Sequence, residues 1–557
     1  MFERLGFFLA RHRKGVLSLF VVALITAGSV GSLVFSRLNG GGYSDPHSDS
    51  ARVVNFLHDN FHVKDPALAI VVDAGKDLKD PQVIADENSL EKSLSHENGV
   101  TEILSYWSSG FQPTLVSRDG KSAYLFVYTA NSDPSASKGL AKVVLAKYGS
   151  SYKSLHLYIG GFSAFNEAIS SKISKDLAVA EAISIPLTFI LLLFVFGSLV
   201  SAAMPLVVGV SAILGTFLIL YLISLITDVS IFALNLTTGM GLGLGIDYSL
   251  LIVNRFREEL HAGKSIEDSI AKTVATAGRT VFFSGLTVFV TVGSLIMFPQ
   301  MFLKSFGYAG VGVVAMAVLG ALIPLPAILG ILGNRVDALT IRRSAIVPRE
   351  EGRWAKTARF VMRRPVAVVL ITLIILGVCA APLKNIVFSQ ADTRVLPASN
   401  RVAIASQVAL DKFPGQEANP IEFIIPHGTG LTTQITEYEA KIARVSGIVR
   451  VNPVQTSGDI VRFTAIHSMG PRTPPAQDLI NRLRAISAPH GTLIGGVAAD
   501  YADSQAGIIH SLPRVFIWIG LTVLILLFLF TGSIILPIKA VILNVLSLAA
   551  SFGVLTV

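Results

Sequence analysis

The sequence predicts a polytopic α-helical membrane protein with an internally duplicated plan and two α+β domains outside the membrane. Of its 557 residues, 52% are hydrophobic and 15% are charged, and the mean hydropathy is +0.61. A soluble domain carries about 25% charged residues. Apolar stretches long enough to cross about 30 Å of hydrocarbon as helices recur along the chain, and two long polar segments interrupt them.

The first apolar stretch is predicted to be an uncleaved membrane anchor. Arg11, Arg13 and Lys14 precede the apolar run 15–35. At about 21 residues, this run is longer than the apolar core of a signal peptide and long enough to span the membrane. Segment 1–35 therefore comprises a short N-terminal segment and the first spanning helix.

Eight further apolar stretches follow in two groups. Five fill the segment 177–333, one occupies 365–383, and two lie in 514–557. Their expected bounds are 177–199, 202–226, 230–254, 280–298, 303–332, 365–383, 515–530 and 534–557. The chain is thus expected to cross the membrane nine times.

Basic residues predict the side on which each loop lies. Loop 334–364 contains nine Lys or Arg residues against three acids, and loop 255–279 contains five basic residues; such loops stay in the cytoplasm. The N-terminus is then cytoplasmic, and the polar segments 36–176 and 384–513 lie outside a plasma (inner) membrane. The net charge of +9 is read as this topological signal, because a nucleic-acid binder would carry a basic patch on a polar domain.

Both outer segments alternate strand and helix patterns, which predicts a ferredoxin-like α+β module in each. In the first segment the expected strands are 68–72, 123–128 and 155–159, and the expected helices are 135–148 and 163–175. In the second the expected strands are 421–425, 460–466 and 492–494, and the expected helices are 401–413 and 476–486.

Glycine pairs at a constant offset predict an internal duplication. Gly160-Gly161 recurs as Gly495-Gly496, and Gly197-Ser198 recurs as Gly532-Ser533, both 335 positions later. At this offset the counterpart of the fourth spanning helix would fall near position 582, beyond the last residue, Val557. The second copy is therefore expected to lack its last three helices.

The fourth spanning helix carries the most unusual motif of the chain. It contains Gly239, Gly241, Gly243 and Gly245, followed by Asp247 and Tyr248. The GxGxGxG spacing inside a membrane span differs from the GxGxxG turn of dinucleotide-binding folds. Glycines one turn apart allow another helix to approach closely, so these four are predicted to be helix-packing residues.

Asp247 is the candidate proton carrier. A charged Asp near the centre of a membrane costs about 2.5–3.5 kcal/mol on insertion scales, and intramembrane acids commonly mark proton relays. Tyr248 is expected to hydrogen-bond in the same network. The alternative is a neutral, hydrogen-bonded Asp247 that only locks helix packing.

Polar residues of the fifth spanning helix are a possible proton path. Ser284, Thr287, Thr291 and Ser294 recur at spacings of three and four on one face. Equally, their hydroxyl groups could bond back to carbonyl groups of their own helix. The sequence does not decide between these two interpretations.

Other chemistry finds no support in the sequence. The single cysteine, Cys379, excludes a Cys-cluster metal site, and His58 and His62 have no acidic or Cys partner that suggests a metal. There is no GxxxxGK[ST] phosphate-binding loop and no Ser/His/Asp signature. The chain is therefore expected to be neither an enzyme nor a cofactor-binding protein.

The motif and the layout together resemble a known family. The run Gly245-Ile246-Asp247-Tyr248, followed by Asn254-Arg255-Phe256-Arg257-Glu258-Glu259, resembles the MMPL family (mycobacterial membrane protein, large) of the RND superfamily. The resemblance implies an RND-type duplication, outer porter domains that accept substrate from the outer leaflet, and proton-motive-force-driven export of lipids, envelope precursors or hydrophobic antibiotics.

The resemblance also implies a second Asp-Tyr pair on a tenth helix, for which this sequence has no position. A second chain or a homo-oligomer is expected to supply the absent helices if the protein transports. The alternatives are a non-transporting scaffold subunit, a degenerate truncated pump, or a helper of protein secretion whose outer domains bind unfolded polypeptide.

Overall fold

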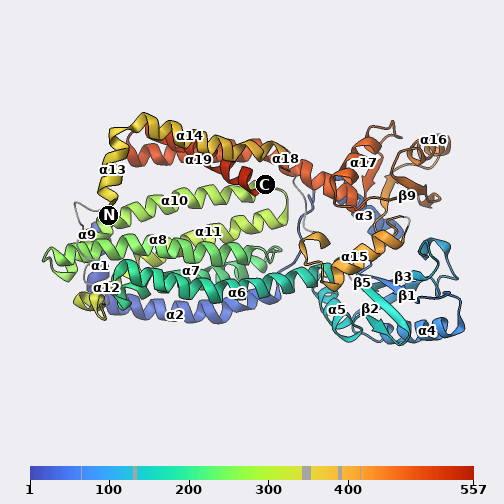
Figure 1. The fold of residues 1–557 in the computed structure, drawn as a ribbon, viewed down its shortest axis with the longest axis horizontal. Helices are drawn as coiled ribbons and strands as arrows, with labels where there is room; N and C mark the ends of the chain where they lie inside the picture. The colour runs from blue at the N-terminus through green and yellow to red at the C-terminus, as the bar shows by residue number, and fades with distance from the viewer. Residues whose placement is uncertain (64–65, 130–133, 341–352, 387–391, 414, 557) are drawn as a thin grey trace.

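The computed structural model describes residues 1–63, 66–129, 134–340, 353–386, 392–413 and 415–556. Long helices running side by side form a bundle on the left of Figure 1, and two α+β units extend from its right-hand end. We call this end of the bundle the α+β end. The middle of the predicted basic loop 334–364 lies outside the described residues.

Nine helical segments of the described residues are long and apolar enough to cross a membrane. They are Arg13–Ser36, Phe162–Phe196, Leu199–Ser224, Ala233–His261, Ile266–Met297, Met301–Asp337, Pro365–Asn385, Val497–Thr531 and Ile535–Leu555. Each overlaps one of the predicted stretches, which confirms a multi-pass membrane protein.

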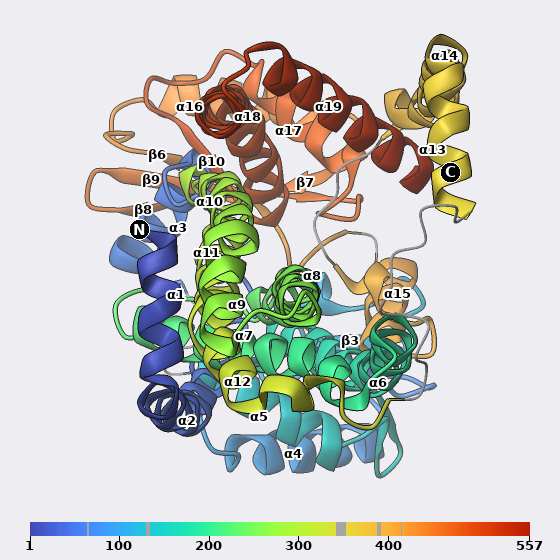
Figure 2. The same cartoon turned by 90° about the vertical axis from the view of Figure 1, so that its left-hand side faces the viewer.

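The elements of these segments are α2 (Arg13–Gly31), η1 (Ser32–Ser36), α6 (Phe162–Phe196), α7 (Leu199–Ser224), α8 (Ala233–His261), α9 (Ile266–Thr273), the π-helical η3 (Val274–Gly278), α10 (Arg279–Gly293), η4 (Ser294–Met297), α11 (Met301–Leu322), α12 (Pro324–Leu332), η5 (Gly333–Asp337), α14 (Pro365–Ala380), η7 (Ala381–Asn385), α18 (Val497–Thr531) and α19 (Ile535–Leu555). Two shorter helices, α1 (Phe2–Arg11) and α13 (Arg353–Arg363), lie at the opposite end (Figure 2).

The predicted stretch 303–332 is not one continuous helix. α11 ends at Leu322 and α12 begins at Pro324, and between them Ile323 has φ −114° and ψ −70°. Proline has no N–H to donate, its ring clashes with the preceding turn, and it disfavours helical geometry in the residue before it. The helix is therefore broken inside the apolar run.

The first α+β unit contains a five-stranded antiparallel sheet in the order β2-β3-β1-β5-β4. Its elements are β1 (Leu68–Asp73), α4 (Pro81–Ser95), β2 (Val100–Ser105), η2 (Pro113–Leu115), β3 (Ser122–Thr129), α5 (Pro134–Lys147), β4 (Ser151–Tyr152) and β5 (Leu155–Gly160). The predicted strands are β1, β3 and β5. β2 was not predicted, because it lies at the sheet edge with mostly half-exposed residues.

The second α+β unit repeats this plan. Its strands run in the order β10-β6-β9-β7, and β8 pairs with β9. Its elements are β6 (Ile421–Ile425), α16 (Thr432–Ala443), β7 (Ile448–Val451), β8 (Gln455–Ser457), β9 (Ile460–His467), α17 (Pro474–Arg484) and β10 (Leu493–Gly495). Apart from the short β4 and β8, both units follow a β-α-β-β-α-β order along the chain.

Each unit continues directly into a long helix of the bundle. α6 and α18 are both 35 residues long. Gly161 and Gly496 precede them with φ of 98° and 90°, and Gly197 and Gly532 follow them with φ of 68° and 67°. Residues other than glycine rarely adopt positive φ. The recurring glycines therefore mark equivalent ends of two equivalent helices.

A helix from the first half of the chain packs on the second unit. α3 (Asp49–Phe61) precedes β1 in sequence, yet its Val53 forms a buried cluster with Ile424 and Leu493. A Cβ atom at Gly495 would lie 2.4 Å from the Val53 side chain. The contact therefore requires glycine at the end of β10.

The exchange is reciprocal, because a helix from the second half packs on the first unit (Figure 1). α15 (Arg401–Lys412), which follows the short η8 (Thr393–Val395), packs beside β5. Lys412 Nζ lies 2.6 Å from Asp73 Oδ2 on β1, and the Phe413 ring lies 4.0 Å from the Tyr124 ring on β3. Each α+β unit thus packs against a helix that comes from the other half of the chain.

We expect the first unit to lose stability as pH rises, because of one buried carboxyl. Glu87 on α4 is fully buried. Burial and the neighbouring Glu91 raise the pKa of Glu87 from 4.5 to about 9. Between these values the folded state holds a proton that the unfolded chain releases, so the contribution of Glu87 to stability is greatest below about pH 4.5 and falls by up to about 1.4 kcal/mol per pH unit toward pH 9.

Glu87→Gln should remove this dependence, because the amide stays neutral. The melting temperature of the detergent-solubilised protein is to be compared at about pH 5.5 and about pH 8.5. Between these two pH values the melting temperature of the wild type should fall more than that of Glu87→Gln. Glu102→Gln, at an exposed position of the same unit, should behave as the wild type. An equal loss in wild type and Glu87→Gln would contradict the assignment.

Candidate functional site

The predicted relay residues lie on α8, and Asp247 is its central residue. α8 runs from Ala233 to His261, which places Asp247 fourteen residues from either end. At 1.5 Å per residue this is about 21 Å. A hydrocarbon layer about 30 Å thick would enclose this position wherever the helix crosses it centrally.

One face of α8 packs tightly against α7 and α11. A Cβ atom at Gly245 would lie 2.5 Å from the Gly209 Cα on α7, and one at Gly241 would lie 2.6 Å from an Ile213 side-chain carbon. Because the first contact is between two backbones, neither helix can yield locally. Gly241 and Gly245 therefore hold α8 against α7.

The opposite face of α8 is exposed in the described structure. Gly239, Gly243 and Asp247 recur at intervals of four residues, and all three are exposed. A Cβ atom at Gly239 or Gly243 would meet no atom within 4 Å. The predicted packing role is therefore not seen for these two glycines, because they point away from α7. Asp247 shares their face and not that of the packing glycines.

Tyr248 points away from Asp247. Consecutive residues of a helix diverge by about 100°, and here Asp247 is exposed while Tyr248 is buried. The Tyr248 hydroxyl reaches α10, where it lies beside Ser284 and 3.6 Å from the position of a Cβ atom at Gly285. Among the described residues it has no partner in hydrogen-bond geometry. The two residues therefore face separate surroundings.

The polar residues of α10 and η4 bond mainly to their own helix. Thr287 Oγ1 donates to the Phe283 carbonyl at 2.9 Å, and Thr291 Oγ1 donates to the Thr287 carbonyl at 2.8 Å. Ser294 donates to the Thr291 carbonyl at 2.6 Å. This geometry favours the local interpretation for these hydroxyl donors. Ser284 is the exception, since it lies beside the Tyr248 hydroxyl.

A buried arginine anchors the end of α8 opposite the α+β end. Arg257 Nε lies 2.8 Å from Asp337 Oδ1, and its Nη1 donates to the Phe196 carbonyl at the end of α6 at 3.1 Å. His261 Nε2 also contacts Asp337, at 2.9 Å. The sequence indicated only a basic helix end here. Asp337, an acid within the basic loop 334–364, was the signal from which this ion pair could have been predicted.

An apolar cavity of about 380 Å³ adjoins α8 near the α+β end. α6, α7 and α8 contribute its walls, with apolar residues such as Ile185, Leu214 and Leu242. Glu181, Asn235 and Thr238 add polar atoms. The cavity wall therefore combines a mostly apolar surface with a few hydrogen-bonding groups.

Metal chemistry finds no site in the part of the chain that the structure describes. No group of three His, Cys, Asp or Glu side chains lies close enough to hold an ion there. His58 pairs with Asp59 at 2.9 Å on the surface, and Cys379 is a half-buried free thiol in α14.

Residues 42–368, more than half of the chain, match the MMPL family. A putative membrane protein of Streptomyces coelicolor is 32% identical over 98% of this chain and 75% of its own length. The trehalose monomycolate exporter MmpL3 of Mycobacterium tuberculosis is 29% identical over the whole chain, which spans 64% of that protein. The mycolic acid-containing lipids exporter MmpL11 of Mycolicibacterium smegmatis is 29% identical over 60% of its length.

Proposed function

Because the chain belongs to the MMPL family, we propose that it acts in proton-motive-force-driven export of lipids or other hydrophobic molecules across the cytoplasmic membrane. The chain spans less than two thirds of MmpL3 and MmpL11. Export is therefore proposed for the assembled transporter, with whatever further helices a second chain, a homo-oligomer or a longer chain provides.

The observation that carries this proposal is a carboxyl group at the middle of a membrane-spanning helix. Asp247 is the central residue of α8. No described residue forms an ion pair or a hydrogen bond with its side chain. A carboxyl group without a fixed partner can bind and release a proton when the environment of its exposed face changes. A permanently locked Asp would instead be buried against a donor.

Tyr248 and Ser284 are proposed to assist the relay from the other side of α8. The buried hydroxyl of Tyr248 lies beside Ser284 on α10. Movement of α10 against α8 would alter the surroundings of this tyrosine. Thr287 and Thr291 lie farther along α10, and the lone pairs of their hydroxyl oxygens remain available to accept hydrogen bonds.

The α+β units are proposed to be outer porter domains of ferredoxin-like fold. Their shared β-α-β-β-α-β order and matching strand order support this assignment and an RND-type duplication. The basic loops at the opposite end of the bundle support a cytoplasmic N-terminus. We place the domain limits at 36–176 and 384–513, although α6 and α18 continue across them without a break.

The substrate is proposed to be a lipid whose chain enters the cavity between α6, α7 and α8. The cavity walls are apolar, and Glu181 and Asn235 lie among them as hydrogen-bonding groups. Two relatives support this substrate class, since one is named as the trehalose monomycolate exporter MmpL3 and the other as the mycolic acid-containing lipids exporter MmpL11.

Export should require a proton gradient. The assembled transporter, reconstituted in vesicles with a fluorescent lipid, is expected to move that lipid across the membrane only when a pH gradient is imposed. A protonophore should reduce transfer to the rate of protein-free vesicles. Transfer that is equally fast with the protonophore would contradict proton coupling, and no transfer under any gradient would favour the scaffold interpretation.

A further inference from the structure

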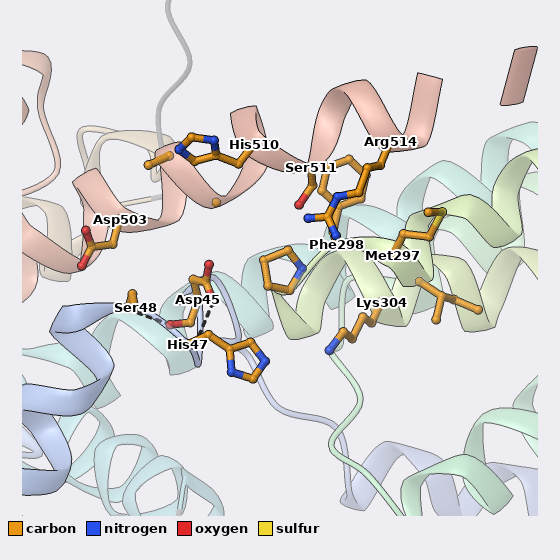
Figure 3. Close-up of a pocket in the computed structure, with 14 residues that line it drawn as sticks. Asp45, His47, Ser48, Met297, Phe298, Lys304, Asp503, His510, Ser511 and Arg514 are labelled. Carbon is orange, nitrogen blue, oxygen red and sulfur yellow. Dashed lines mark hydrogen bonds between the residues drawn. The ribbon is translucent and has the colours of Figure 1, made fainter. Parts of the chain in front are cut away.

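We propose that a cavity at the α+β end of the bundle binds the anionic headgroup of an outer-leaflet lipid through Lys304 and Arg514. The cavity has a volume of about 540 Å³. Three segments line it: the loop 45–48 before α3, residues 296–304 from the end of η4 to the start of α11, and residues 503–514 of α18 (Figure 3). No residue of the relay contributes to it.

The cavity lies where the protein leaves the membrane. The turn between η4 and α11 joins two membrane-crossing segments, so it must lie at a membrane surface. On α18, Arg514 directly precedes the apolar run that begins at Val515. Given the orientation proposed above, this surface is the outer one. Met297 and Phe298 line the same cavity and would meet the upper part of an acyl chain.

The two carboxylates of the cavity already have partners in the protein. Asp503 lies 2.6 Å from Arg484 Nη2 and accepts the backbone N–H of Ser50 at 3.1 Å. Asp45 accepts the backbone N–H of His47 at 2.9 Å. Neither acid forms an ion pair with Lys304 or Arg514.

The two cations lack such partners. Neither the Lys304 ammonium nor the Arg514 guanidinium forms an ion pair or a hydrogen bond with any described residue. Basic residues are disfavoured on the outer side of a membrane. A lone cation at a helix end can extend along apolar surface to the interface, but that tendency does not explain two cations from separate halves of the chain lining one cavity.

The surroundings favour a lipid over a free anion. In a lipid, the phosphate group is joined directly to the acyl region, and here the cations adjoin apolar side chains in the same way. Arginine binds phosphate oxygens in pairs and lysine binds them as a point charge. The ligand we infer is an anionic phospholipid such as phosphatidylglycerol, seated with its phosphate between Lys304 and Arg514.

A tryptophan of α18 provides the test. Trp518 is 46% exposed and lies one turn from Arg514 toward the membrane. In a background with Trp107→Phe and Trp354→Phe, phosphatidylglycerol with brominated chains should quench Trp518 more strongly than brominated phosphatidylcholine at the same mole fraction. Lys304→Gln with Arg514→Gln should lower this preference several-fold, to near one.

Lys384→Gln is the matched control. Lys384 is an exposed cation at the same end of the bundle, beyond α14, and does not line the cavity. This variant should keep the preference, and unchanged melting temperatures should show that all variants are folded. Equal quenching by both lipids in the wild type, or a preference that survives the double substitution, would overturn the proposal. Displacement of the lipid by millimolar inorganic phosphate would overturn the assignment to a lipid, since it would identify a free-anion site.

Discussion

Replacing Asp247 by asparagine is expected to reduce lipid export to the level of protein-free vesicles while the abundance of the protein stays unchanged. Asparagine keeps the shape of the side chain but cannot take up or release a proton. Asp247 is exposed on α8, so the substitution removes no packing contact in the described structure. Lipid transfer under an imposed pH gradient measures the effect, and the melting temperature and yield report folding.

Two further variants make this result specific. Asp247→Glu keeps an ionisable group one methylene farther from the helix and should retain part of the activity. Glu258→Gln makes the same carboxyl-to-amide change at an exposed residue near the end of α8, and it should leave proton coupling intact. Full export by Asp247→Asn would end the relay hypothesis. A loss of folded protein with that variant would instead assign Asp247 to helix packing.

Most spanning helices could be predicted because their signal is local. A run of about 20 apolar residues spans a membrane wherever it occurs, and the glycine pairs at a constant offset marked equivalent helix ends. Two features were not indicated by this signal. Pro324 interrupts the helix of the sixth stretch, and α6 and α18 each continue without a break from an α+β unit into the bundle.

The exchange of helices between the two α+β units could not be predicted. α3 and α15 have ordinary amphipathic sequences, which show that one face is buried but not which sheet covers it. Only the structure places Val53 against Gly495 and Lys412 against Asp73. Contacts between residues more than 300 positions apart leave no pattern in a single sequence.

The sequence predicts which residues of the candidate site share one helix, but not which way each of them faces. The sequence identified four glycines and an Asp-Tyr pair on one helix. The rotation of that helix decides their roles, because it turns Gly241, Gly245 and Tyr248 toward neighbouring helices and leaves Gly239, Gly243 and Asp247 exposed. Rotation depends on which side packs best against α7 and α11, and this is a property of three helices together.

Alanine substitutions at Gly245 and Gly243 are expected to have opposite effects on stability. A Cβ atom at position 245 would lie 2.5 Å from the Gly209 Cα, so α7 and α8 must separate. Overpacking typically costs about 1–3 kcal/mol, and a contact between two backbones should be at or above the upper end. At position 243 nothing lies within 4 Å, and alanine favours a helix over glycine by up to about 1 kcal/mol.

Melting temperatures in detergent measure both effects. The two variants are matched, because each replaces a glycine of α8 by alanine. Gly209→Ala should fall between them, because its Cβ would lie 3.3 Å from Leu242 on α8. Equal melting temperatures for Gly245→Ala and Gly243→Ala would contradict the rotation of α8. Export by Gly243→Ala then carries separate information. A stable Gly243→Ala variant that no longer exports would mean that another helix must approach the exposed face of α8 closely during transport, and Asp247 lies on this face.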